Sequence, residues 1–99
     1  SSDMDYTNLK SSVFENTHAI KIILILRNEG PMVKGELASK IAKGTSTVQA
    51  RIADLIEMGL LTEKREPVKP FKKIVELTPK GRAASNLLFA LEDLLIDSE

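Results

Sequence analysis

Residues 36–61 read ELASKIAKGTSTVQARIADLIEMGLL, and this stretch decides the fold. Its first seven residues place apolar side chains on one face of a two-turn helix, which we predict over residues 36–42. A longer amphipathic helix is predicted over residues 45–58, because its apolar residues recur at positions i, i+4, i+7 and i+8. Gly59 ends this second helix. The stretch therefore predicts two short helices joined by a tight turn.

The flanking sequence adds a helix before this pair and a hairpin after it. Residues 17–28 are almost wholly apolar and predict a helix buried on most sides, with Gly30 as its left-handed cap. Residues 60–66 and 71–78 are extended runs, and the two prolines between them exclude a helix across the gap. These runs predict a β-hairpin with a basic tip.

The last predicted element is a long helix with an apolar stripe. Thr78 is its N-cap and Pro79 its first residue, and it runs to about Ile96. The stripe either folds back on its own domain or pairs with a second copy. We favour a homodimer, because one small domain cannot cover both this stripe and the apolar helix over 17–28. The residues expected in the interface are Leu87, Leu88, Leu91, Leu94 and Leu95, joined by Met4 to Phe14 as a weak helix or arm.

Four short motifs fall in this order of elements. They are Glu36-Leu37-Ala38, Thr47-Val48, Gly59-Leu60-Leu61 and Leu77-Thr78-Pro79-Lys80-Gly81-Arg82. Together they resemble the pattern of the MarR-like and PadR-like winged helix-turn-helix transcription regulators, over roughly residues 19–90. The resemblance implies a mainly helical α+β fold with a small β-hairpin as the wing, and double-stranded DNA as the partner. One departure is Val33, where the family usually has the Ser or Thr that completes a capping box.

The expected organisation follows from this fold. Residues 1–16 form an N-terminal arm or short helix, residues 17–78 the winged helix-turn-helix domain, and residues 79–99 the dimerisation helix. We expect a sequence-specific regulator with one helix in the major groove and the wing on the adjacent minor groove. The alternative is a winged-helix protein-interaction module within a larger nucleic-acid-processing assembly, because the same fold serves both roles.

The central part of the chain is basic, which agrees with DNA binding by that part. The net charge is zero, but residues 34–82 hold 11 basic and 6 acidic residues, whereas the flanks hold 3 basic and 8 acidic ones. Residues 64–73 are the densest basic patch, which alone could be a solvated loop. We expect Phe71 to pack at the base of the wing. The residues expected to contact the DNA backbone are Lys40, Lys43, Arg51, Lys64, Arg65, Lys69, Lys72 and Lys73.

The polar face of the helix predicted over 45–58 is the candidate for reading bases. Gln49 can pair bidentately with adenine, and Ala50 can touch a thymine methyl group. The competing interpretation is that the Ser and Thr residues only cap the helix. The residues expected to contact bases are Thr45, Ser46, Thr47, Gln49 and Ala50.

The composition argues against catalysis and metal binding. With no Cys and a single His, His18, the chain has neither a thiolate nucleophile nor a His-rich metal site, so we expect no enzyme, no metal and no cofactor. The longest apolar run is 22–26, too short to span a membrane. We expect a cytoplasmic, nucleoid-associated protein. A small-molecule effector is left open, with the cleft of the dimer as its only expected place.

Overall fold

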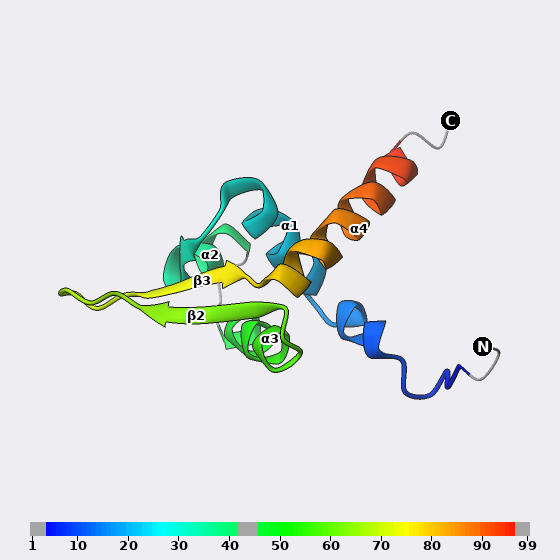
Figure 1. The fold of residues 1–99 in the computed structure, drawn as a ribbon, viewed down its shortest axis with the longest axis horizontal. Coiled ribbons are helices and arrows are strands. Elements are labelled where there is room, and N and C mark those ends of the chain that lie inside the picture. The colour runs from blue at the N-terminus through cyan, green and yellow to red at the C-terminus, as the bar shows by residue number, and fades with distance from the viewer. Residues whose placement is uncertain (1–3, 42–45, 97–99) are drawn as a thin grey trace.

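The computed structural model describes residues 4–41 and 46–96, and Figure 1 shows how they are arranged. In chain order the elements are the 3-10 helix η1 (Lys10–Glu15), α1 (Ala19–Glu29), β1 (Met32–Val33), α2 (Lys34–Ile41), α3 (Ser46–Glu57), β2 (Leu61–Arg65), β3 (Lys73–Leu77) and α4 (Pro79–Ile96). The four predicted helices and the hairpin are confirmed. The fold is mainly helical with a small antiparallel sheet, which is the predicted class.

The sheet has one strand more than the hairpin that the sequence predicts. Its order is β1-β3-β2, and β1 pairs with β3 through Met32 opposite Val75 and Val33 opposite Ile74. A strand of two residues is too short to leave an alternating pattern, so the prediction of a two-stranded unit is wrong. Because β1 leads directly into α2, this pairing fixes the start of that helix on the sheet.

The core lies where α1, α2 and α3 meet the sheet. Its fully buried side chains come from every one of these elements: Ile22, Ile23, Leu26, Leu37, Val48, Ile52, Leu55, Leu61 and Val75. Val13 of η1 packs against the same cluster. Helix α1 is less enclosed than expected, because Ile20 is 37% exposed. It ends at Gly30 with φ +82° and ψ −171°, a conformation open to glycine but outside the left-handed helical region that we expected.

A cluster of hydrogen bonds joins the start of α4 to the residues that follow α3. The Thr78 hydroxyl donates to the carbonyl of Gly59 at 2.6 Å and accepts from the Gly81 amide at 2.9 Å, so Thr78 caps α4 as predicted. The amide of Thr78 also donates to the carbonyl of Leu60 at 3.0 Å. These bonds bring together two of the motifs found in the sequence.

Close packing between these two segments requires a glycine at position 81. A Cβ atom built there would stand 1.9 Å from the carbonyl oxygen of Leu60, far inside the van der Waals limit. The residue is therefore glycine because the α4 backbone lies directly against the chain that enters β2. The wing and α4 are consequently attached to each other as well as to the core.

Two parts of the molecule project from the core in different directions. Figure 1 shows the hairpin of β2 and β3 extending to one side and the C-terminal turns of α4 extending to the other. The molecule is accordingly elongated, with a longest extent of 51 Å and a shortest of 26 Å. Among the described residues, no helix combines the length and apolar character that crossing a membrane requires.

Candidate nucleic-acid interface

Helix α3 has the two faces that the sequence predicts. Val48, Ile52 and Leu55 have no exposed surface and anchor the helix in the core. The opposite face is exposed and consists of small or polar residues, namely Ser46, Thr47, Gln49, Ala50 and Ala53. Thr45, also expected at this face, lies outside the described residues, as does Lys43. Most side chains on the exposed face are small, so a partner could approach the helix backbone closely.

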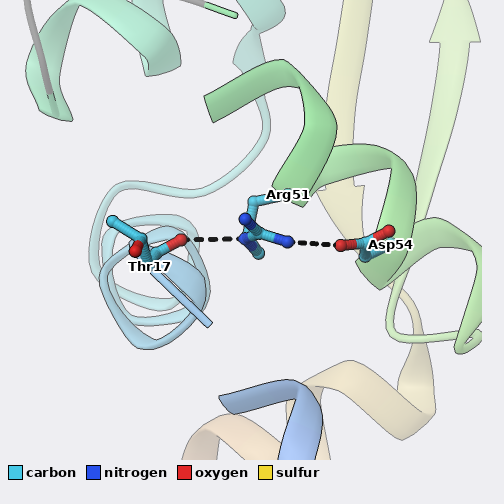
Figure 2. Close-up of polar contacts among 3 residues, drawn as sticks. All are labelled: Thr17, Arg51 and Asp54. Atoms are coloured by element: carbon cyan, nitrogen blue, oxygen red, sulfur yellow. Dashed lines mark hydrogen bonds and ion pairs between the residues drawn. The ribbon is translucent and has the colours of Figure 1, made fainter. Parts of the chain in front are cut away.

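Arg51, one of the expected contacts to the DNA backbone, is engaged in contacts within its own chain. Figure 2 shows its guanidinium lying between Thr17 and Asp54. Its Nε donates to the carbonyl oxygen of Thr17 at 2.9 Å, and one terminal nitrogen pairs with the Asp54 carboxylate at 2.5 Å. Only 17% of the side chain is exposed. Arg51 therefore ties α3 to the segment before α1 and is not displayed toward a partner.

The long side chains of the wing fall into two groups. Lys64 pairs across the hairpin with Glu76 at 2.8 Å, and Lys73 lies 3.8 Å from Glu63. That same carboxylate is 3.6 Å from Lys34 at the start of α2. These cations are partly neutralised by neighbours, which an expectation based on charge spacing alone could not foresee.

The second group consists of Arg65, Lys69 and Lys72, which are exposed. Within residues 4–41 and 46–96, no ion pair involves them. Glu66 is the only acid between β2 and β3, and one of its oxygens accepts from the backbone amide of Lys72 at 3.3 Å. The end of the wing is therefore the most strongly positive part of the hairpin. Lys40, expected to contact a phosphate beside α3, pairs with Glu29 at 3.4 Å on a half-exposed surface.

Phe71 does not pack at the base of the wing, contrary to expectation. It lies in the connection between β2 and β3 with φ +57° and is 43% exposed, beside Val68 at 67%. The Phe71 amide donates to the carbonyl of Val68 at 2.9 Å, and the Glu66 amide donates to that of Lys72 at 2.9 Å. The ring is not among the side chains that pack against the core.

The apolar stripe of α4 divides at about its middle. The first turns pack against α1, with Ser85 buried and Ala84 and Leu88 half-buried against the core. The other large apolar residues of α4 are between 49% and 74% exposed: Leu87, Phe89, Leu91, Leu94, Leu95 and Ile96. Phe89 and Ile96 were not among the expected interface residues. Leu88, which was among them, contributes to its own domain.

A polar contact links the last turn of α1 to α4. Arg27, in the last turn of α1, donates to the Asn86 side-chain oxygen at 2.6 Å, and its guanidinium lies 4.6 Å from the centre of the Phe89 ring. A groove of about 540 Å³ runs beside this contact and is lined by Leu24, Arg27, Asn28, Phe89 and Glu92. Nothing among the described residues forms a cluster of His, Cys, Asp and Glu suited to a metal ion.

The comparison with known families agrees with this architecture. Residues 15–62 match the family model described as "Winged helix-turn-helix DNA-binding", a range that begins before α1 and ends in β2. No curated protein matches the chain by sequence.

Solved structures extend the agreement to the whole fold. A possible HxlR family transcriptional factor from Thermoplasma volcanium GSS1 superimposes with a TM-score of 0.80 at 22% identity, over 97% of this chain and 88% of that one. A probable transcriptional regulator from Pseudomonas aeruginosa gives 0.69 at 23%, over 79% and 59%. A mutant MarR from E. coli complexed with operator DNA gives 0.69 at 17%, over 79% and 56%. The chain thus spans little more than half the length of the last two.

The fold and the family match define one class. The chain has the winged helix-turn-helix fold, and residues 15–62, just under half of the chain, match a family model of DNA-binding proteins. Within that class, its fold is the one shared by MarR-type and HxlR-type transcription regulators, in which the hairpin described above is the wing and α3 is the second helix of the helix-turn-helix.

Proposed function

We propose that this chain is a transcription regulator that binds double-stranded DNA sequence-specifically as a homodimer, without catalysing a reaction, on the nucleoid in the cytoplasm. The observation that carries the proposal is the outer face of α3, which is exposed and made of small and polar residues. The opposite face is fully buried, so the helix is held rigidly enough for a few side chains to read base edges.

Gln49 is the central residue of the proposed major-groove contact. Its amide can bond both edge atoms of an adenine, and the neighbouring Ser46 and Ala50 are too short to hold it away from the base. Ser46, Thr47 and Ala50 complete the contact, and Thr45 extends it toward the N-terminus. Asp54 and Glu57 lie on the C-terminal half of α3, where a carboxylate would repel phosphates. The contact is therefore confined to the first two turns.

The wing supplies the proposed contact to the sugar-phosphate backbone. Arg65, Lys69 and Lys72 carry most of it, because Lys64 and Lys73 are already near carboxylates. Lys40 and Lys43 would act beside α3, whereas Arg51 is withdrawn from the set because of its intramolecular bonds. Such contacts position a protein on DNA without reading its sequence.

The dimer is proposed from the exposed end of α4. Its large apolar side chains are exposed, and a monomer would leave that apolar surface in water, which is costly for a small domain. Pairing of two copies through Leu87, Leu91, Leu94 and Leu95 would remove that surface. Two α3 helices would then be related by a two-fold axis, so the site should be an inverted repeat with half-site centres roughly 34 Å apart.

The test is a selection of binding sites from random duplexes, followed by titration of Gln49→Ala on the preferred site and on random DNA. We expect an inverted repeat, and a loss of about 1–3 kcal/mol on that site with little loss on random DNA. Glu57→Gln, at the far end of the same helix, is the matched control and should not lower specificity. Selected sites without a dyad, or an equal loss on every sequence, would count against the proposal.

A further inference from the structure

The tip of the wing carries an apolar pair that the contacts to phosphates do not use. Val68 is 67% exposed and Phe71 43% exposed, and both stand on the connection between β2 and β3. The connection is closed by the bond from the Phe71 amide to the Val68 carbonyl at 2.9 Å. The two residues thus stand in the same hydrogen-bonded turn.

The backbone conformation of Phe71 is costly to maintain. A phenylalanine with φ +57° adopts a backbone conformation that bulky residues rarely take, and that conformation persists only where the surrounding structure holds it. The bonds between Glu66 and Lys72 on the other side of the turn provide that support. We therefore ask which partner surface an aromatic ring exposed in this way would contact.

The surrounding charge selects the partner. Lys69 and Lys72 flank the apolar pair, and Arg65 lies at the end of β2. The single carboxylate in the connection, Glu66, is directed to the backbone of Lys72. An apolar centre with a cationic rim is complementary to the minor groove of DNA, in which apolar sugar walls stand between two rows of phosphates.

We propose that Phe71, assisted by Val68, is an apolar probe of the minor groove that makes the protein disfavour G·C base pairs at the outer ends of its site. The inference rests on the proposed function, because the wing reaches the minor groove only when α3 occupies the major groove beside it. An A·T pair presents acceptors alone on the floor of this groove, whereas guanine adds the N2 amino donor. A phenyl ring offers that donor no acceptor and removes its water, so a G·C pair beneath the ring leaves a hydrogen bond unmade.

The discriminating experiment changes the minor groove without changing the major groove. Inosine lacks the N2 amino group of guanine and is otherwise identical at the edges that α3 would read. Duplexes carrying the selected site are prepared with A·T, G·C or inosine·C pairs in the outer flanks. Their affinities for the full chain are measured by fluorescence anisotropy over a series of salt concentrations.

The wild-type protein should bind the A·T and inosine·C flanks alike and the G·C flank about five- to tenfold more weakly. Phe71→Ala should bind all three with similar affinity, and Phe71→Leu should retain part of the preference. Because the lost contact is apolar, the slope of log K against log salt should stay at its wild-type value in both variants. Phe71 is exposed, so these variants keep the native core.

Tyr6→Ala is the matched control, because Tyr6 is an exposed aromatic residue remote from the wing, and it should preserve the preference. The proposal is overturned if wild type binds all three flanks equally, if inosine·C behaves like G·C, or if Phe71→Ala keeps the discrimination. It is also overturned if Phe71→Ala changes the sedimentation of the protein without DNA, which would assign the tip to a second copy. A wild-type protein that binds no duplex at all would instead overturn the proposed function.

Discussion

The wing and the C-terminal half of α4 are both left uncovered by the domain, but they differ in chemistry. The wing ends in cations whose nearest carboxylates are already engaged, and α4 ends in large apolar side chains. The first surface is suited to a polyanion, whose attraction weakens with salt, and the second to another apolar surface, whose attraction does not. The comparison predicts that the proposed DNA binding and the proposed self-association can be altered separately, except where the two regions are joined.

The contact between Gly81 of α4 and Leu60, which joins the two regions, should give the largest effect, a loss of stability. Gly81→Ala places a methyl group on the Leu60 carbonyl, and backbone must move to relieve the clash. We expect a loss of about 3 kcal/mol or more in the free energy of unfolding, measured by urea denaturation. Ala83→Gly, two residues later and on the exposed side of α4, is the control and should cost only about 1 kcal/mol. Equal losses in the two variants would show that the clash with the Leu60 carbonyl does not cause the destabilisation.

The second change separates the two regions. Leu91→Asp places a carboxylate in the exposed stripe of α4 and should convert a dimer at micromolar concentration to a monomer, as followed by sedimentation velocity. The variant should lose preference for an inverted repeat but keep salt-dependent binding to random DNA. Asn86→Asp adds the same charge on another face of α4, where Arg27 can pair with it, and should remain dimeric. A wild-type protein that sediments as a monomer would contradict the assignment of α4.

Arg51 tests whether a cation inside the fold behaves differently from one on the wing. Arg51→Met removes the bonds to Thr17 and Asp54 but keeps the length of the side chain. We expect a loss of about 1–2 kcal/mol in unfolding free energy, because hydrogen bonds to a charged group are involved. The salt slope of DNA binding should be unchanged. A flatter slope with unchanged stability would return Arg51 to the set of phosphate contacts.

The smallest expected effect belongs to the wing. If three or four phosphates are neutralised per subunit, the wild-type slope of log K against log salt for a dimer is about −5 to −7. The double variant Lys72→Ala, Lys73→Ala should flatten it by about two units, because mainly one effective lysine is lost from each of the two subunits, and it should weaken specific and random duplexes alike. Lys73 lies near Glu63 and Lys72 has no such partner among the described residues, so Lys72→Ala alone should account for most of the change. Its stability should match wild type.

Much of the fold is predictable because the decisive signals are local. Thr78-Pro79 begins α4 at the residue where the structure begins it, and Gly59 ends α3 as expected. What the sequence could not predict depends on contacts between distant residues. Met32 and Val33 form a strand only because β3 lies beside them, and Arg51 is engaged only because the chain before α1 passes within reach of it.

The candidate site shows the same division. The outer face of α3 was predictable, because helical periodicity alone separates Ser46 and Gln49 from Val48 and Ile52. The ion pairing of the wing lysines was not predictable, because it depends on which carboxylate stands opposite each lysine across the hairpin. Phe71 was placed wrongly for a related reason: a basic run with one aromatic residue does not reveal which way the turn directs the ring.

The contact of Gly81 with Leu60 also has a mechanical consequence for a pair of copies. Because the two backbones are in direct contact, we expect the start of α4 and the start of β2 to move together, so that helix and wing turn as one unit. The tip of the wing and the end of α4 lie at opposite ends of a molecule 51 Å long (Figure 1). A small change in the angle at which two α4 helices cross would therefore swing both wings through a larger arc, and the spacing between them would follow the geometry of the dimer.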